Sequence, residues 1–124
     1  MQSIVLYGIP NCDTVKKART WLQQQNIEFV FHDFKKNGLE RGTVEKWLQH
    51  VSLDVLINRK GTTWRALSDE QKASAAGSDA AIALMLASPS IIKRPVLQRA
   101  EAEAAAIRQV DVGFSAQQYE QLFK

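Results

Sequence analysis

The sequence has a single cysteine and no long hydrophobic run in its 124 residues. Because Cys12 has no partner in the chain, an internal disulfide, a Cys-x-x-Cys redox pair and a cysteine-rich zinc site are excluded. The longest apolar stretch, Ala80 to Ala87, is much shorter than the ~20 residues that cross a bilayer. The start, Met1-Gln2-Ser3, lacks the basic region of a signal peptide. We therefore expect a cytoplasmic protein that does not associate with membranes.

The charged residues form no strongly basic segment, although the net charge is +3. Lysines and arginines are spread along the chain, and no run of them exceeds two. Such a dispersed set is more typical of a solvated surface than of a surface that follows nucleic-acid phosphates, so we expect no nucleic-acid partner. His32 and His50 have no cysteine or carboxylate at zinc-binding spacing, so we expect no metal site.

Hydrophobic patterning predicts a βαβ unit at the N-terminus. Residues 3–7 are apolar and β-rich, as in a central strand buried on both faces, and Gly8-Ile9-Pro10-Asn11 ends this strand. Helical periodicity follows from Asp13, and residues 28–34 predict a second strand. The apolar stripe of the predicted helix consists of Val15, Ala18 and Leu22. Such units pair their strands in parallel through a right-handed crossover.

The middle of the chain predicts several helices. Residues 35–38 indicate a polar turn, residues 43–51 a helix, and residues 59–63 an irregular loop. Ser68 and Gln71 match a capping box that starts a short helix. Ser78-Asp79 is predicted to cap another helix, which runs through Leu86.

The C-terminal part predicts two strands and a helix. Residues 89–97 indicate a turn leading into a strand, residues 101–106 an exposed hairpin connection, and residues 107–112 a further strand. Ser115 and Gln118 match a second capping box, which opens a helix to Phe123. The order predicts a thioredoxin-like α/β fold with a mixed four-stranded sheet. We expect one domain over residues 1–124, with a helical insertion at about 39–90 between the βαβ and ββα units.

The position of Cys12 decides how its thiol is interpreted. A lone cysteine is usually a small buried hydrophobic residue. Cys12, however, lies between the end of the first strand and the start of the helix, where the helix dipole and free backbone N–H groups favour the thiolate. Lys16 and Lys17 add positive potential. We therefore predict a reactive nucleophile at Cys12.

A thiolate that attacks an anionic or polar substrate needs groups that stabilise negative charge. Arg94 is the best candidate, because it precedes Pro95 at the start of a strand predicted to return beside the first. An X-Pro bond adopts the cis form at low cost, and a cis bond here would hold Arg94 toward the site. Arg59 is the second candidate, since arginine offers a bidentate fork to oxyanions and carboxylates. From sequence alone, both could equally be surface residues.

These residues carry a family resemblance over essentially the whole chain. Two segments, Tyr7-Gly8-Ile9-Pro10-Asn11-Cys12-Asp13-Thr14-Val15-Lys16-Lys17-Ala18 and Ile92-Lys93-Arg94-Pro95-Val96-Leu97, resemble the glutaredoxin-linked arsenate reductase (ArsC) family. Within it, the match is to the YffB-like branch, whose members are proposed to be glutathione-dependent thiol reductases. The resemblance implies a catalytic Cys12, oxyanion or glutathione contacts from Arg59 and Arg94, and a cis bond at Pro95. We add Asn11, Thr14 and Lys16 to the expected substrate- or glutathione-binding residues.

The sequence also departs from the classical arsenate reductases of the family. Their loop resembles His-x-Pro-x-Cys-Gly-Thr-Ser-Arg, whereas this chain has Gly8, Asp13, Val15 and Lys16 at the positions of His, Gly, Ser and Arg. The third arginine of the classical oxyanion site has no counterpart in Val112-Gly113-Phe114-Ser115. We therefore expect an arsenate reductase-like protein that reduces arsenate inefficiently.

The sequence predicts a glutathione-dependent thiol or oxyanion reductase with one nucleophilic cysteine. No permanently bound cofactor is expected. Since a second cysteine is absent, the resolving thiol must come from outside, with glutathione as co-substrate and glutaredoxin as a possible partner. We expect a monomer. The alternative is a non-catalytic ArsC/Spx-like interaction or redox-regulatory protein, which we rank lower because Val15 breaks the Cys-x-x-Cys switch of the Spx branch.

Overall fold

The computed structural model describes residues 3–101 and 106–123 and divides into two compact units. Unit 1 combines Met1–Gly38 with Arg94–Lys124, and unit 2 is Leu39–Lys93. Unit 1 therefore contains both ends of the chain, and unit 2 is the segment between them. The expectation of a single domain over 1–124, with an insertion at about 39–90, stays a prediction.

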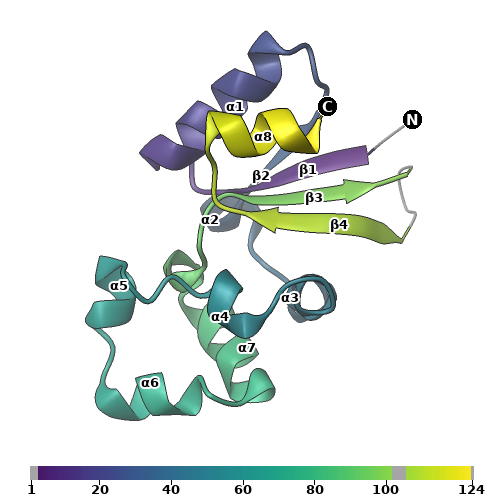
Figure 1. The fold of residues 1–124 in the computed structure, drawn as a ribbon. Coiled ribbons are helices and arrows are strands. Elements are labelled where there is room, and N and C mark those ends of the chain that lie inside the picture. Colours follow the sequence, from purple (N-terminus) through teal and green to yellow (C-terminus); the bar gives the residue numbers. More distant parts are fainter. Residues whose placement is uncertain (1–2, 102–105, 124) are drawn as a thin grey trace. The chain divides into compact units, whose positions relative to one another are not determined.

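Unit 1 is built on a mixed four-stranded sheet in the order β2-β1-β3-β4 (Figure 1). Its strands are β1 (Ser3–Gly8), β2 (Val30–Asp33), β3 (Val96–Ala100) and β4 (Ile107–Val112). The first two strands are parallel, whereas β3 is antiparallel to both β1 and β4. This pairing confirms the predicted α/β class and mixed sheet. The central position of β1 is also confirmed.

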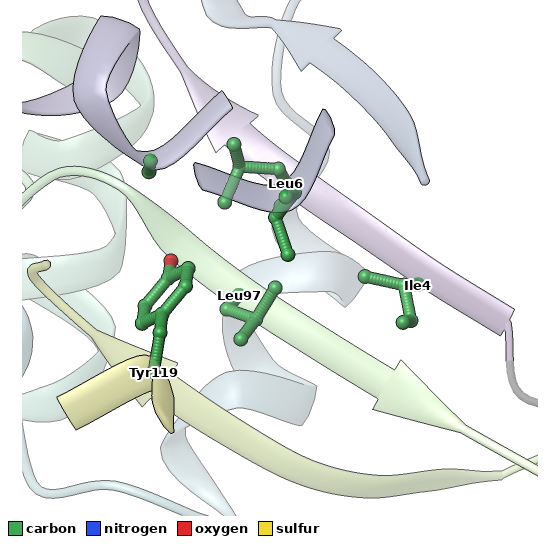
Figure 2. Packing of buried hydrophobic residues seen from close by; sticks show 6 residues of the cluster. Ile4, Leu6, Leu97 and Tyr119 are labelled. Carbon is green, nitrogen blue, oxygen red and sulfur yellow. The ribbon is translucent and has the colours of Figure 1, made fainter. Parts of the chain in front are cut away.

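Two helices cover one face of this sheet, α1 (Asp13–Gln24) and α8 (Ala116–Leu122) (Figure 1). Their apolar sides enclose a core whose members come from β1, β3 and both helices: Ile4, Leu6, Ala18, Leu22, Leu97 and Tyr119. Figure 2 shows Ile4 and Leu6 of β1 and Leu97 of β3 in this core, with the Tyr119 ring of α8 next to Leu97. The predicted stripe of α1 is confirmed, since its three residues are fully buried.

The opposite side of β1 carries a smaller aromatic cluster. The Tyr7 ring lies 4.8 Å from the His32 ring and 6.3 Å from the Phe34 ring, measured between centroids. Phe34 starts the one-turn helix α2 (Phe34–Asn37) and is buried. The His32 Nε2 atom lies 2.7 Å from the carbonyl oxygen of Gly38 at the end of this turn. These contacts explain why Tyr7 is buried near the C-terminal end of β1, where the chain continues into the Cys12 loop.

Unit 2 is helical. Its elements are α3 (Arg41–Leu48), α4 (Leu53–Leu56), α5 (Thr62–Arg65), α6 (Asp69–Ser74), α7 (Ser78–Ala87) and the 3-10 turn η1 (Pro89–Ile91). An isolated bridge between Ile57 and Ile92 is flanked by two hydrogen bonds of 2.8 Å, from Asn58 N to Ile91 O and from Lys93 N to Leu56 O. These bonds anchor the segment that returns the chain to Arg94.

Several boundaries differ from the sequence-based expectations. The polar turn at 35–38 is the helix α2, because the Asp33 carboxylate accepts hydrogen bonds from the backbone N–H groups of Lys35 and Lys36. The strand expected at 28–34 is only Val30–Asp33, and the helix expected at 43–51 is Arg41–Leu48. Part of the loop expected at 59–63 belongs to α5. The hairpin connection expected at 101–106 lies largely outside the described residues.

Of the three predicted helix caps, one is fully formed, one is formed in part and one is wrong. The box of Ser68 and Gln71 is formed in both directions. At α8, the Ser115 hydroxyl accepts from Gln118 N, but the Gln118 side chain donates to Val112 O and does not close the box. The prediction that Ser78 caps α7 is wrong: Gly77 is the capping residue, and Ser78 is already the first residue of the helix.

Within the described part of the chain, no helix combines the length and apolar character needed to cross a membrane.

Candidate functional site

Cys12 occupies the N-cap of α1, directly after the turn that leaves β1. Its backbone is held on both sides: Cys12 N donates to Ile9 O at 3.2 Å, and Lys16 N donates to Cys12 O at 2.9 Å. The Cys12 backbone is extended, with φ −93° and ψ 124°, as is usual for a capping residue. The thiol is therefore held at the positive end of a helix of twelve residues while staying partly exposed to solvent.

The surroundings of Cys12 favour the thiolate. Partial burial acts to raise the pKa of the Cys12 thiol, but it is outweighed by the backbone N–H of Val15, the Arg94 guanidinium and the backbone N–H of Thr14. The net effect lowers the pKa of Cys12. Among the described residues of α1, none forms a well-aligned capping hydrogen bond with the Cys12 side chain. The backbone N–H groups of Val15 and Thr14 and the Arg94 guanidinium all favour the thiolate, and Arg94 adds its positive charge.

Arg94 reaches Cys12 because of strand pairing in unit 1. Tyr7 of β1 pairs with Val96 of β3, so the residues just before Val96 lie beside the end of β1 and the Cys12 loop. The Arg94–Pro95 peptide bond is cis, which confirms that prediction. Arg94 is half-buried and Pro95 is buried. The structure thus brings together Cys12 and Arg94, two residues that are 82 positions apart in the sequence.

Gly113 supports the Arg94–Pro95 segment, and sequence reasoning missed this role. The Gly113 N–H donates to Pro95 O at 2.9 Å, and the residue before it, Val112, pairs with Val96. Gly113 has φ 81°, a left-handed conformation that favours glycine. A glycine directly after a predicted strand was the available signal, but its partner became visible only with the pairing of β3 and β4.

The remaining residues predicted around the thiol lie on the same turn. Asn11 is exposed in the loop before Cys12, and Thr14 is half-buried at the second position of α1. Lys16 is exposed, and its backbone N–H makes the first hydrogen bond of the helix. The backbone N–H of Val15 was not predicted as a contributor, although the third position of a capped helix regularly supplies such a donor.

Arg59, the second arginine predicted for the site, belongs to unit 2. Its guanidinium forms an ion pair with the Asp54 carboxylate at 2.5 Å and lies 5.6 Å from the centre of the Trp64 ring. Both partners are in unit 2. Cys12, Arg94 and Pro95 therefore belong to unit 1, whereas Arg59 and its two partners belong to unit 2. Within the described ranges, no group of three His, Cys, Asp or Glu side chains is arranged to hold a metal ion.

Comparisons with known proteins agree with this geometry. The solved structure of a protein called YffB is 42% identical, covers 96% of this chain and 97% of its own, and superposes with a TM-score of 0.83. The solution structure of an arsenate reductase (ArsC) related protein from Brucella melitensis is 44% identical, with coverages of 98% and 95% and a TM-score of 0.71. An uncharacterised protein of Haemophilus influenzae is 37% identical over 97% of this chain and 98% of its own.

A regulatory protein is among the more distant relatives. The global transcriptional regulator Spx of Streptococcus pyogenes is 24% identical over 76% of this chain and 70% of its own length. The model of the ArsC family matches residues 7–122, which include Cys12, Arg94 and Gly113. This match covers nearly the whole chain and agrees with the two similar solved structures. The chain therefore belongs to the ArsC family, and it has the thioredoxin-like α/β fold of that family's solved members.

Proposed function

We propose that this protein is a glutathione-dependent thiol or oxyanion reductase in which Cys12 is the only protein nucleophile. The observation that carries the proposal is the convergence on Cys12 of the Arg94 guanidinium and the backbone N–H groups of Val15 and Thr14. A cysteine with a purely structural role needs neither the helix N-terminus nor a neighbouring arginine. The thiolate, and not the thiol, is the attacking species in disulfide exchange, so these groups increase the reactive fraction at neutral pH.

With glutathione disulfide, the reaction has two balanced steps. The Cys12 thiolate attacks one sulfur of the disulfide, an S–S bond forms between Cys12 and one glutathione, and the other glutathione leaves as a thiolate. Because the sequence contains no second cysteine, the adduct is resolved only by an external thiol. That thiol, from glutathione or glutaredoxin, attacks the mixed disulfide and releases Cys12 as the thiolate. A new S–S bond joins the sulfur of that thiol to the glutathione sulfur, so Cys12 returns to its starting state and the external thiol takes the place of one glutathione in the disulfide.

Arg94 has two roles in this scheme. Its positive charge stabilises the Cys12 thiolate before attack, and its guanidinium fork is available to a carboxylate of glutathione or to the oxygens of an oxyanion substrate. Pro95, Asn11, Thr14 and Lys16 are proposed as further contacts, because they lie next to Arg94 or near Cys12 in the chain. We keep Arg59 as a proposed contact of lower priority, because its guanidinium is paired with Asp54.

The decisive experiment is incubation of the protein with oxidised glutathione, followed by intact mass measurement. The expected result is one added glutathione per chain, absent in Cys12→Ser and removed by reduced glutathione. A wild-type protein that forms no adduct would refute the reductase proposal. The result would then favour the second candidate, a non-catalytic interaction or redox-regulatory protein, which the similarity to Spx supports.

A further inference from the structure

The Val15 side chain occupies the space next to Gly8, in the turn that contains the nucleophile. Gly8 is the last residue of β1, and Val15 is a fully buried residue in the first turn of α1. If position 8 carried a Cβ atom, its three nearest heavy atoms outside the adjacent residues would all belong to the Val15 side chain. The separations would be 2.7 Å to Cγ2, 3.2 Å to Cγ1 and 3.6 Å to Cβ. The methyl groups of Val15 thus fill the space that a side chain at position 8 would need.

This contact links the end of the central strand to the first turn of the catalytic helix. Gly8 does not have a left-handed backbone, so its conformation would be open to other residues. A larger residue at position 8 is excluded by the Val15 side chain. Valine in a helix has one strongly preferred χ1 rotamer, so the methyl groups cannot rotate away cheaply. Any residue larger than glycine at position 8 would therefore displace the backbone of the turn that contains Cys12, Thr14 and Val15.

We propose that Val15 is a positioning residue: its side chain, wedged against the backbone of Gly8, holds the first turn of α1 so that the Val15 N–H and the Arg94 guanidinium both face Cys12 Sγ. Val15 is suited to this because its backbone acts on the sulfur while its side chain meets β1. The side-chain contact thereby fixes the distance between the strand and the N–H group. The inference deepens the proposed function, on which it rests for the use of the thiolate.

A double-mutant cycle tests the wedge. Gly8→Ala places a methyl group within 2.7 Å of Val15 Cγ2, so the first turn of α1 must move. Val15→Ala removes the wedge and leaves a void. In Gly8→Ala/Val15→Ala the nearest remaining contact is to the residue-15 Cβ at 3.6 Å, an ordinary van der Waals distance, and the new methyl group takes part of the vacated space. The double variant should therefore recover the geometry that each single variant loses.

The readout is the pKa of the Cys12 thiol, measured from thiolate absorbance against pH, together with the rate of alkylation at pH 6. Each single variant should raise this pKa toward that of a free thiol, and the double variant should return it toward the wild-type value. Because alkylation at pH 6 follows the thiolate fraction, its rate in Gly8→Ala should fall about tenfold for each unit by which the pKa of Cys12 rises.

Val44→Ala is the matched control, since Val44 is an equally buried helical valine in unit 2. It should lower the melting temperature without changing the pKa of Cys12. If Val15→Ala behaves like Val44→Ala, or if the double variant is worse than either single one, Val15 is only a packing residue and the inference is wrong. If Gly8→Ala fails to fold, Val15→Ala and the double variant still decide. Since the pKa readout needs no glutathione, a wild-type protein without a glutathione adduct would refute the proposed function and leave this test intact.

Discussion

At the scale of single residues, the site depends on one cation beside one sulfur. Arg94→Ala should slow formation of the glutathione adduct, because both the hydrogen bond and the charge at Cys12 are lost. A charge-assisted hydrogen bond contributes roughly 1.5–3 kcal/mol, which corresponds to a rate loss of about tenfold or more. The measurement is adduct mass against time with oxidised glutathione.

Arg108→Ala provides the matched control for Arg94→Ala. Arg108 lies on β4 and pairs with Glu101 at 2.9 Å, and both side chains are largely exposed to solvent. Its loss should change stability by only a few tenths of a kcal/mol and leave adduct formation unchanged. Equal rates in wild type, Arg94→Ala and Arg108→Ala would show that Arg94 does not assist the reaction.

The lowered pKa of Cys12 predicts a specific pH dependence of both reactivity and stability. At pH 6, Cys12 should be alkylated faster than the thiol of free glutathione, because a larger fraction is thiolate. The folded-state pKa lies below the unfolded value of about 8.5, so the folded state binds fewer protons between the two values. The thiolate's contribution to stability is therefore complete above the unfolded pKa and is lost as the pH falls through the folded pKa.

Comparison with Cys12→Ser isolates this contribution. The difference in free energy of unfolding between wild type and Cys12→Ser should increase with pH inside this window and become constant above it. Denaturant unfolding at several pH values from about 5 to about 9.5 measures the difference. A difference that does not vary with pH would contradict a perturbed thiol.

Arsenate should be a poor substrate. Gly8 and Val15 replace a histidine and a serine of the classical loop that the sequence resembles, and Phe114 lies in the segment where the third arginine is missing. The loss of one positioned oxyanion donor costs about 10²–10³ in rate. A coupled assay with arsenate, glutathione and glutaredoxin, run beside a classical arsenate reductase, should show far lower turnover. Equal turnover would mean that other groups replace these donors.

At the scale of elements, the two helix N-termini at Ser115 and Ser78 should respond differently to loss of the serine hydroxyl. Ser115→Ala should lower the free energy of unfolding by about 1 kcal/mol, because the Ser115 hydroxyl accepts from Gln118 N at the start of α8. Ser78→Ala should have almost no effect, since Gly77 occupies the cap of α7. Denaturant unfolding compares the two variants. A larger loss for Ser78→Ala than for Ser115→Ala would reverse this assignment.

The sequence could predict those parts of the fold that have a clear local pattern, and it missed those that do not. The strand at β1, the buried stripe of α1 and the bounds of β4 follow from local periodicity and chain breakers, and all were predicted. The one-turn helices α2 and α5 are too short to show a helical period. The start of α2 depends on a single carboxylate, Asp33, whose hydrogen bonds could not be distinguished from those of a turn.

For the candidate site, too, local features could be predicted from the sequence, whereas most long-range contacts could not. The position of Cys12 at a helix N-terminus is local information, because Gly8 to Asn11 interrupt the strand just before it. The contact between Arg94 and Cys12 needed the pairing of β1 with β3, which the fold class implied. The bond from Gly113 to Pro95, the wedge of Val15 and the pairing of Arg59 with Asp54 depend on side-chain and backbone distances that no sequence pattern specifies.

At the scale of the whole molecule, stability depends on polar groups buried beneath α8. Arg99 is only 6% exposed, and its guanidinium donates to Leu122 O at 2.9 Å and pairs with Asp111 at 3.5 Å. Tyr119 is fully buried beside them, and its hydroxyl has no hydrogen-bond partner among the described residues. Burial and the Asp111 carboxylate raise the pKa of Tyr119, and they outweigh the opposing charge of Arg99.

This arrangement predicts how the molecule responds to alkali. Because the folded-state pKa of Tyr119 is raised above the unfolded value of about 10, the neutral phenol stabilises the fold, and this contribution is lost as the pH rises above that value. Tyr119→Phe removes the titrating group but keeps the ring, whose centroid lies 4.6 Å from that of Phe114 and 5.6 Å from that of Trp21. The variant should therefore lose less stability than wild type between neutral and alkaline pH.

At neutral pH, the two tyrosine-to-phenylalanine changes should differ. Tyr119→Phe should be neutral or slightly stabilising, since an unpaired buried hydroxyl contributes no net hydrogen bond. Tyr7→Phe should cost about 1 kcal/mol, because the Tyr7 hydroxyl interacts with the Gln98 side chain. Denaturant midpoints at neutral and alkaline pH measure both effects. If Tyr119→Phe lost as much stability as Tyr7→Phe at neutral pH, the Tyr119 hydroxyl would have to contribute a stabilising contact, and the alkaline loss could no longer be assigned to its unpaired burial.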